Sequence, residues 1–598
     1  MTTQASHPHG AEGEGHQADG RSRREELAER LGRPGTSAAV TGAPRIVPAS
    51  SGQRGLWFLE QIAPKTAAYV ETAAIDLAGP YDTAALRSAL ADVVDGQAAL
   101  RTACVTGRSG PVQLVHPPGT VTVPLHESTH PGDPDDPHTL RARLEHDGML
   151  EPFDLGRAPL LRARLYRVSP TRATLVLAVH HIVWDGASMG VLLADLTAAY
   201  EARSTGRTDT THRTGPDYTD LTLAERGRES DAGHRASLDH WAELLHGAPV
   251  TALPATAGPG DTPQEAGAVP RRSGVVRRSV PAPTVERLRA RANEAGCTMF
   301  MMGIACLTAA LRPGPAPLPV LVAAPMSVRP PGAERLIGYL TNTVPVLVTP
   351  PPGSSRRVFL EEVRRSCVRS WTHRAVPLED IVAAAAPART AGHPPFADVL
   401  FNYTALPEPV RDATGLTWQA HWLPSPSPRC ALLVSWNESQ GRLLVRLEHD
   451  PGRLTAGTAN AVADALLAVA EHLAEADDIP YDALPALASP PLPAPAAAEQ
   501  AGRPGTGRPG ARTVTSGVRA AAAQVWREAL GLDETDELDD EDDFFELGGR
   551  SLDAARIATK LSAALGRDVS LRTVLDTESF GEFLAQVELA PTTATKGA

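Results

Sequence analysis

Runs of apolar, β-branched residues alternate with runs of helical periodicity between about residues 44 and 485. Short apolar runs bounded by turn residues indicate buried strands, and apolar positions that recur once per helical turn indicate helices packed on a core. Alternation of this kind predicts an α/β fold. The strand candidates are 174–179, 319–324, 343–348 and 431–447, and the helix candidates are 82–95, 190–202, 284–311 and 357–371.

The composition changes outside this region. Residues 1–43 are polar and rich in Gly and His, which predicts a disordered tail, and a second short tail is expected over 591–598. Residues 488–513 are rich in Pro, Ala and Gly, as linkers are. A compact helical domain is expected over 514–590. Its helix candidates are Val518–Leu530 and Ser551–Leu565.

The charge and the cysteines limit the class of protein. A net charge of −13 and an isoelectric point near 5.8 argue against nucleic acid as the main partner, because phosphate binding needs a basic surface. No apolar run is long enough to predict a membrane span, and the N-terminus lacks the apolar core of a signal peptide. Scattered cysteines without metal-ligand spacing favour a reducing, cytoplasmic location. They are Cys104, Cys297, Cys306, Cys367 and Cys430.

The most informative motif follows the strand predicted at 174–179: it contains His180, His181, Asp185 and Gly186. An imidazole at a strand end can take a proton from a nucleophile that attacks a carbonyl, because its pKa lies near working pH. Successive side chains of a strand point to opposite faces, so we expect only one histidine to face a reaction space. The same geometry makes the pair a poor chelate, and no metal is expected.

The pattern HHxxxDG at 180–186 resembles the central motif of condensation domains from nonribosomal peptide synthetases. One segment departs from the family, because Gly96-Gln97-Ala98 stands where Arg-His-Glu is usual. The resemblance implies a condensation domain over 44–487, with two lobes similar to chloramphenicol acetyltransferase arranged in a V: an N-lobe of about 44–215 and a C-lobe of about 216–487. Other segments resemble further family motifs, in the family's order: Pro48–Leu59, Leu100–Thr102, Tyr218–Asp220, Ile337–Thr343 and His373–Glu379.

The resemblance also implies roles for the matching residues. His181 would position or deprotonate an acceptor amine, whereas His180 would be structural. Asp185 would hold its loop through an ion pair with Arg329, since a buried carboxylate needs a partner. Gly186 would allow close backbone approach and offer its N–H to an oxyanion.

Two further residues have competing interpretations. Ser188 completes a GxSxG pattern between a strand and a helix, which is the setting of a serine hydrolase nucleophile. That interpretation is disfavoured, because no HGGG-type loop precedes the serine and the condensation motifs account for the same residues. Asn342 would either line the tunnel of the family or serve a structural role.

The segment Asp542–Leu552 resembles the phosphopantetheine site of carrier proteins, which has an acidic and aromatic stretch, two glycines, one variable residue and Ser-Leu. The glycines allow a tight turn, and Ser551 begins a helix, where a phosphate gains from the helix dipole. The alternative is that Ser551 is only an N-cap. The resemblance implies 4'-phosphopantetheine on Ser551, attached by a separate phosphopantetheinyl transferase.

A condensation domain followed by a peptidyl carrier domain predicts an acyltransferase that forms amide bonds. The donor acyl thioester would come from an upstream carrier protein, for which residues 1–43 are a possible docking element. The acceptor would be held on Ser551 and activated by a trans-acting adenylation enzyme, because no adenylation domain lies between the two domains. The alternatives are condensation with a free small amine or hydroxyl, giving an amide or ester, and a non-catalytic recruitment platform.

Overall fold

The structure is a computed structural model of the 598-residue chain. It describes residues 43–487 and 516–591 apart from short gaps, so the expected tails and the linker 488–513 lie almost wholly outside the described residues. The gaps are 63–65, 108–109, 130–136, 208–216, 229–230, 249–250, 252, 254–271, 313–317, 386–395, 397, 476–477, 531, 534–537, 545–546, 548–550, 568, 570–572, 575–576 and 578.

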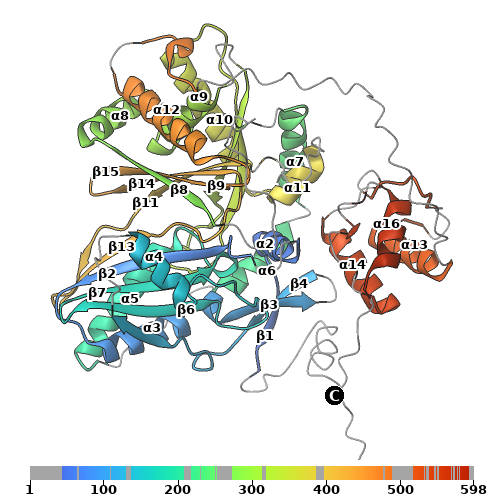
Figure 1. The fold of residues 1–598 in the computed structure, drawn as a ribbon, viewed down its shortest axis with the longest axis horizontal. Coiled ribbons are helices and arrows are strands. Elements are labelled where there is room, and N and C mark those ends of the chain that lie inside the picture. The colour runs from blue at the N-terminus through green and yellow to red at the C-terminus, as the bar shows by residue number, and fades with distance from the viewer. Residues whose placement is uncertain are drawn as a thin grey trace, which may run out of the picture.

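The N-lobe is built on a six-stranded sheet in the order β12-β13-β2-β7-β6-β5. Its strand β7 (Arg172–His180) contains the predicted apolar run, and every residue after Arg172 is buried. Helices α3 (Thr83–Gly96) and α5 (Ser188–Ser204) pack against each other below this sheet in Figure 1. The other strands of the sheet are β2 (Val70–Ala78), β5 (Leu125–Thr129), β6 (Leu161–Ser169), β12 (Val410–Arg411) and β13 (Thr417–Trp422).

Smaller elements complete the N-lobe. A three-stranded sheet in the order β1-β4-β3 stands apart from the six-stranded one. Helix α2 (Ser51–Ile62) leads from β1 toward β2, and η1 (Ala98–Arg101) precedes β3. The remaining elements are β1 (Arg45–Pro48), β3 (Thr102–Gly107), β4 (Gly110–Val115), α4 (Pro137–His146), η2 (His181–Val183) and α6 (Tyr218–Arg228).

The C-lobe is built on a second six-stranded sheet in the order β10-β9-β11-β14-β15-β8. Figure 1 shows helices on the outer face of this sheet, namely α8 (Ala282–Glu294), α9 (Met299–Leu311), α10 (Arg356–Thr372) and α12 (Ala456–Ala474). The pair α7 (Ala232–Leu245) and α11 (Leu378–Ala385) packs together at its side. The strands are β8 (Gly274–Val280), β9 (Val320–Ser327), β10 (Thr341–Val348), β11 (Val399–Ala405), β14 (Leu432–Ser439) and β15 (Arg442–His449), and η3 (Tyr481–Ala483) follows α12.

Two predicted elements are each divided in the structure. The helix candidate 284–311 is the pair α8 and α9, which meet at 102°. Gly296 has a φ of +61° there, a conformation that ends helices, and the Thr298 side chain then caps the start of α9. The strand candidate 431–447 is the hairpin of β14 and β15, which turns at Gln440 and Gly441, both with positive φ.

One segment of the C-lobe range belongs to the N-lobe sheet. Strand β13 pairs with β2, with Thr417 opposite Ala78 and Trp422 opposite Ala73. Residues 410–422, like helix α6, therefore depart from the expected boundary near residue 215. The reason is tertiary: Trp418 is fully buried in the N-lobe core, where it packs edge-on against Tyr200 at 5.2 Å. The crossing strand ties the two lobes together.

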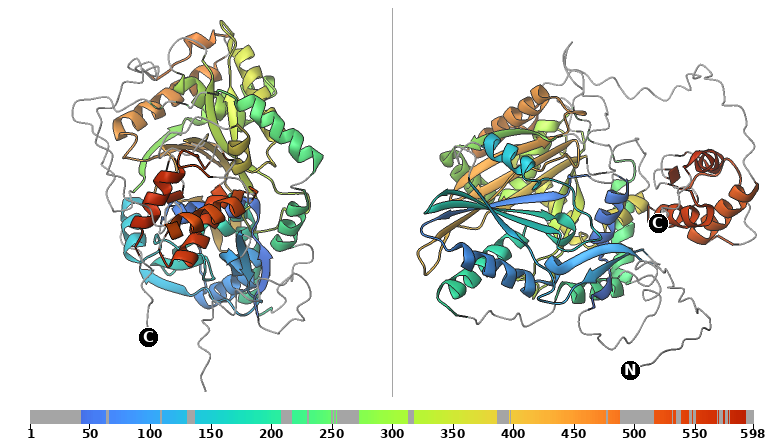
Figure 2. Two further views of the ribbon diagram at one scale, coloured as in Figure 1. Left: turned by 90° about the vertical axis from the view of Figure 1, so that its right-hand side faces the viewer. Right: turned by 60° about the horizontal axis from the view of Figure 1, so that its bottom comes forward.

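The C-terminal domain is a small helical bundle that Figure 2 shows beside the N-lobe. Its described helices are α13 (Ser516–Leu530), α14 (Ser551–Leu565) and α16 (Phe580–Leu589), and the first two match the predicted helices. Trp526 is buried at the centre, with the rings of Phe544, Phe580 and Phe583 at 4.8 to 5.4 Å. Helix α14 approaches α2 of the N-lobe. The predicted α/β fold followed by a C-terminal helical domain is confirmed.

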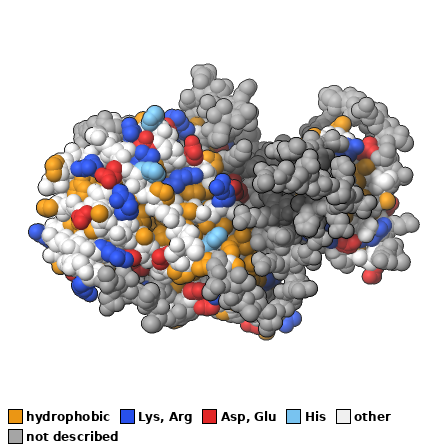
Figure 3. Space-filling view, turned by 90° about the horizontal axis from the view of Figure 1, so that it is seen from below, with side chains coloured by type: hydrophobic (Ala, Val, Ile, Leu, Met, Phe, Trp, Pro, Cys, Tyr) orange, Lys and Arg blue, Asp and Glu red, His pale blue; other side chains and the backbone are white. Residues whose placement is uncertain are grey.

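The described part of the chain contains no single helix that is long and apolar enough to cross a membrane. The bent pair α8 and α9 has the length and composition of a membrane span when the two helices are taken together, but α9 lies in the buried core of the C-lobe. On the face shown in Figure 3, basic and acidic side chains are interspersed. That face therefore presents a mixed surface of the kind that does not favour a polyanion.

The crossing strand leads to a prediction about stability. We expect Trp418→Ala to lower the free energy of unfolding by about 3–5 kcal/mol, because it leaves a cavity in the N-lobe core. Urea unfolding followed by circular dichroism measures this change. The control is Val410→Ala on β12, which is 37% exposed and should change the stability by less than about 0.5 kcal/mol. Equal effects of the two variants would contradict a stabilising role for the crossing.

Candidate active site

The two histidines of the central motif lie at the junction of β7 and the turn η2. His180 ends the strand, is 2% exposed, and accepts a hydrogen bond from the backbone N–H of Ile182 at its Nδ1, 3.1 Å away. Burial and the neighbouring His181 lower the pKa of His180 to about 3, so the ring is neutral. Phe153 meets the ring edge-on at 6.2 Å. His180 is therefore placed as a packed core residue.

His181 faces the opposite way and meets polar groups from both lobes. Its Nδ1 lies 2.6 Å from the carbonyl oxygen of Trp184. Because a carbonyl can only accept, Nδ1 carries the hydrogen and Nε2 keeps a lone pair. The ring of Tyr339, from the C-lobe, meets the imidazole edge-on at 5.0 Å. Burial lowers the pKa of His181, which favours the neutral base near pH 7.

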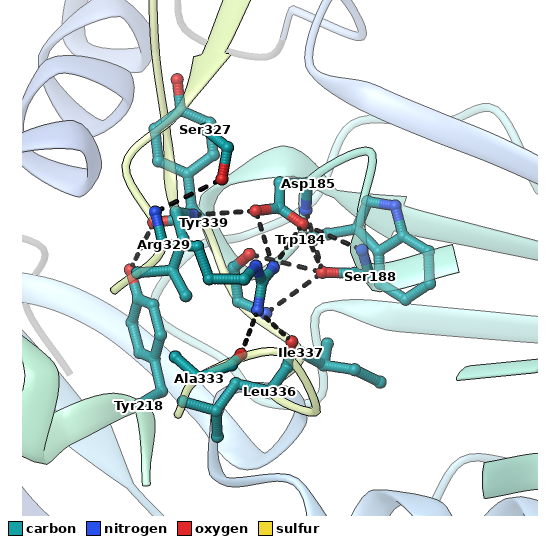
Figure 4. A network of polar contacts seen from close by, with 12 residues as sticks. Trp184, Asp185, Ser188, Tyr218, Ser327, Arg329, Ala333, Leu336, Ile337 and Tyr339 are labelled. Atoms are coloured by element: carbon teal, nitrogen blue, oxygen red, sulfur yellow. Dashed lines mark hydrogen bonds and ion pairs between the residues drawn. The ribbon is translucent and has the colours of Figure 1, made fainter. Parts of the chain in front are cut away.

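The structure brings Asp185 and Arg329 together in the centre of Figure 4. The Arg329 guanidinium lies 2.9 Å from each carboxylate oxygen, and the two side chains are 1% and 8% exposed. Arg329 also donates to the carbonyls of Ala333 and Leu336, at 2.9 and 2.6 Å. The backbone N–H of Leu340 donates to Asp185 at 3.1 Å. One ion pair thus fastens the loop that follows β7 and contains Asp185, called the motif loop below, to residues 328–340 of the C-lobe.

Ser188 belongs to the same network and is fully buried. Its hydroxyl donates to Asp185 at 2.7 Å and accepts from the backbone N–H of Gly338 at 3.2 Å. A hydrolase nucleophile must be exposed to its substrate and hydrogen-bonded to a base. The carboxylate beside Ser188 is already occupied by Arg329, so the serine is a structural link and the hydrolase interpretation stays disfavoured.

The segment Gly96-Gln97-Ala98, which replaces the Arg-His-Glu usual in the family, provides a further link between the lobes. Gln97 is 1% exposed and accepts from the backbone N–H of Ile337 at 3.0 Å. Its amide donates to the carbonyl of Arg335 at 3.2 Å and to Asp195 at 2.9 Å. The side chain therefore holds the same C-lobe loop that carries the partner of Asp185.

Gly186 and Asn342 are placed differently from each other. Gly186 is exposed, and a Cβ atom added there would meet no atom within 4 Å, so its backbone adjoins open space. Asn342 lies in β10 and donates to the carbonyls of Arg374 and Val376, at 2.8 and 2.6 Å. These contacts satisfy its amide within the C-lobe, which favours the structural alternative for Asn342.

Sequence reasoning missed a charge pair next to His181. Glu71 in β2 lies 2.7 Å from Arg429, and its Oε1 lies 3.7 Å from the Nε2 of His181. Burial by itself would raise the pKa of Glu71, but Arg429 and His181 lower it to about 2. Burial also raises the pKa of Tyr69, to about 12, so this phenol beside Arg429 is neutral. The only signal in the sequence is a glutamate near the start of a mostly apolar strand, which also carries Asp76.

The site residues form no metal centre. Searching the described ranges finds no group of three or more His, Cys, Asp or Glu side chains that could hold a metal ion. The five cysteines are buried and free.

Comparisons with known proteins agree with this geometry. The family model described as "Condensation domain" matches residues 44–421. This chain belongs to the condensation-domain family. A second model, described as "Phosphopantetheine attachment site", matches residues 521–587, which follow the condensation domain. The predicted order of the two domains is thereby confirmed.

Curated relatives share the condensation domain over part of their length. The chain is 32% identical over 389 residues to phosphinothricin tripeptide synthetase PhsC of Streptomyces viridochromogenes, covering 64% of this chain and 35% of the relative. It is 29% identical over 406 residues to chondramide synthase cmdD of Chondromyces crocatus, covering 68% of this chain and 10% of the relative. The chain thus spans about a third or less of the length of these relatives.

Solved structures support the fold. The first condensation domain of the calcium-dependent antibiotic synthetase has a TM-score of 0.63 at 22% identity, covering 73% of this chain and 98% of that domain. The X-domain from teicoplanin biosynthesis has a TM-score of 0.61 at 23% identity, covering 75% of this chain and 99% of that domain. The condensation domain described here therefore has the fold of these two domains.

The central ion pair leads to a prediction about stability. We expect Arg329→Met to lower the free energy of unfolding by about 3–5 kcal/mol, because it leaves the Asp185 carboxylate buried and unpaired. The matched control, Arg335→Met, removes a pair in which the arginine is 73% exposed, and should cost less than about 1 kcal/mol. Urea titration followed by tryptophan fluorescence measures both. Similar losses would contradict the importance of the buried pair.

The buried histidine leads to a prediction about pH. Unfolded His180 takes up a proton below about pH 6.5, but the folded protein does not until its pKa of about 3 is reached. Stability therefore falls as pH drops through this window, by about 1.4 kcal/mol per pH unit from this group. Asn at position 180 keeps an acceptor for Ile182 without titrating. We expect His180→Asn to weaken the pH dependence of the free energy of unfolding, measured by urea titration between pH 6 and 4, by up to about 1.4 kcal/mol per pH unit.

The control for this measurement is His126→Asn, a change at an exposed histidine on the edge strand β5. Its pH dependence should match that of the unchanged protein. If the free energy of unfolding depended on pH equally in His180→Asn and in the unchanged protein, His180 would not resist protonation in the folded state.

Proposed function

We propose that this protein condenses a donor acyl thioester with an amino-acyl acceptor held on its own carrier domain, forming an amide bond. The observation that carries the proposal is His181: its Nδ1–H is committed to Trp184, which leaves Nε2 as a proton acceptor between the lobes. Membership of the condensation-domain family and the attachment domain that follows support the same conclusion.

His181 acts on the acceptor amine in this proposal. A neutral imidazole with a fixed tautomer can accept a proton or a hydrogen bond at Nε2. The Trp184 carbonyl orients the ring, and Tyr339 limits its movement from the C-lobe side. Holding the amine next to the thioester is itself worth several kcal/mol of the barrier, because it converts an encounter of two molecules into one within a complex.

The other motif residues support His181. His180 anchors the end of β7 by packing and by its bond to Ile182. The ion pair of Asp185 with Arg329 holds the motif loop against the C-lobe. We assign the exposed N–H of Gly186 to the developing oxyanion, since open space adjoins its backbone and a preorganised N–H stabilises negative charge in the transition state.

The carrier domain fits a phosphopantetheine group at Ser551. Helix α14 begins at this residue, so the unpaired N–H groups of its first turn would stabilise the negative charge of an attached phosphate. Asp553 in that turn is paired with Arg556 at 3.1 Å, which reduces its repulsion of the phosphate. When attached, the arm supplies a thiol on which the acceptor is carried as a thioester.

The two domains imply contact with carrier proteins and with a phosphopantetheinyl transferase. We further propose that a trans-acting adenylation enzyme loads the acceptor and that an upstream carrier protein presents the donor. A cytoplasmic location fits the five buried, free thiols, because reducing compartments preserve them.

The test is transfer observed by intact-protein mass spectrometry. A donor carrier bearing an acyl group is mixed with this protein after its Ser551 arm has been loaded with an amino acid, and the mass of the carrier domain is followed. We expect the mass to rise by the donor acyl group. His181→Ala should slow the transfer by about a hundredfold or more, as loss of a proton-transfer group does, and Ser551→Ala should prevent loading.

The control is His126→Ala, an exposed histidine of the same sheet, which should transfer at the unchanged rate. Product found only on a free amine or alcohol would show that the acceptor is a free small molecule and not an amino acid held on the carrier domain. Absence of product with every donor and acceptor would favour a recruitment platform. Full activity of His181→Ala would remove His181 from the mechanism.

A further inference from the structure

Two partly buried charges from different lobes meet beside His181. Glu71 comes from β2, where it lies opposite Val179 in the sheet, and Arg429 comes from the segment before β14. Their side chains are 18% and 14% exposed, and 2.7 Å separates the carboxylate from the guanidinium. Arg429 also donates to the hydroxyl of Ser425 at 2.8 Å, which fixes its direction within the C-lobe.

A pair of this kind is a costly way to join two lobes. Burying two charges removes their hydration, and packed apolar side chains often serve stability as well or better. The lobes are already joined by the crossing strand β13 and by Asp185 with Arg329. Buried charges that adjoin a reacting group are more often related to chemistry. The position of the Glu71–Arg429 pair therefore calls for a chemical explanation.

The gap between Glu71 and His181 suits a proton donor. Oε1 of Glu71 and Nε2 of His181 are 3.7 Å apart, which is too far for a direct hydrogen bond. Both atoms are acceptors in the resting state, because Nδ1 carries the imidazole hydrogen and the carboxylate is ionised. Two neighbouring acceptors, one of which is charged and already paired with Arg429, favour a group with at least two N–H donors and a positive charge.

We propose that Glu71 is a positioning residue that receives the acceptor as its ammonium ion, holds it against Nε2 of His181, and then neutralises the imidazolium that forms. The proposal rests on the proposed function and narrows the acceptor to amines that are charged at neutral pH. Arg429 keeps Glu71 ionised and directed at this space. An alcohol or a weakly basic amine would gain less from the carboxylate, because it carries no positive charge.

The proton and electron balance of the step is complete without another reactant. The ammonium gives one proton to His181 Nε2, and the freed amine attacks the thioester carbon to form the C–N bond. The C–S bond then breaks, its electron pair stays on sulfur, and the second proton of the nitrogen passes to that sulfur to give the thiol. The imidazolium finally releases its proton to solvent.

The other ionisable groups around His181 leave Glu71 as the anion nearest to its ring. His180 is neutral because burial lowers its pKa. Burial also raises the pKa of Tyr339, and that of Tyr69 to about 12, so both phenols are neutral. The Asp185 carboxylate is held by Arg329. After burial, Glu71 has the largest effect on His181 and raises its pKa, whereas Arg429 lowers it.

The test compares two probes and one charge-removing variant. The probes are alanyl-pantetheine amide, which carries an ammonium, and propionyl-pantetheine amide, which lacks it; their binding to the full chain is measured by calorimetry. We expect the unchanged protein to prefer the alanyl probe, and Glu71→Gln to lose about tenfold of that preference while binding the propionyl probe unchanged. Glu127→Gln, on the edge strand β5, is the matched control and should behave as the unchanged protein.

A second measurement follows the imidazole itself. The pKa of His181, followed by NMR of labelled histidine, should fall in Glu71→Gln because the neighbouring negative charge is gone. The lost preference for the alanyl probe is the change that a purely structural role would not produce. If Glu71→Gln does not fold, Glu71→Gln/Arg429→Gln, which leaves no unpaired charge, replaces it in the probe-binding measurement only, because loss of Arg429 by itself raises the pKa of His181. Equal binding of both probes by the unchanged protein, or an unaltered preference in the variant, would overturn the proposal. Failure of the proposed function would be seen separately, as absence of acyl transfer by the unchanged protein.

Discussion

The ion pair between Asp185 and Arg329 is the contact on which the arrangement of the site depends. It joins the loop that follows β7 to the loop that follows β9, and therefore joins the two lobes at the point where the motif histidines lie. Asp185 accepts from Arg329, from both the backbone and the hydroxyl of Ser188, and from the backbone of Leu340. With so many donors a carboxylate can be buried at little net cost, because its lost hydration is replaced.

The same contact determines what His181 can do. The loop held by Asp185 includes Trp184, whose carbonyl fixes the imidazole tautomer. The loop held by Arg329 includes Tyr339, which packs against the other side of the ring. The histidine is therefore oriented by backbone and packing from both lobes, so that positioning does not depend on the bound substrates. Preorganisation of this kind is what catalysis by proximity requires.

The two buried charge pairs of the site differ in a way that separates structure from chemistry. The Asp185 carboxylate is saturated with donors from the protein and is 1% exposed. The Glu71 carboxylate is 18% exposed and faces an imidazole lone pair. A saturated pair can only hold the fold in place. A pair with an open side can receive a cation, which is the basis for assigning Glu71 to the acceptor amine.

The sequence by itself determined the elements whose signals are local: the buried strand that ends at His180, the helices near Val518 and Ser551, and the motif residues from His180 to Gly186. Arg329 has no local signal, and only the resemblance to a family indicated it as the partner of Asp185. It did not predict the break between α8 and α9 or the hairpin within 431–447, because an apolar run does not show where the chain reverses. Only the tertiary structure decided that β13 crosses to the N-lobe and that Glu71 meets Arg429, 358 residues away in the chain. The physical reason is that a charge on a strand is equally compatible with solvent or with a partner, and the partner is chosen by how the two lobes pack.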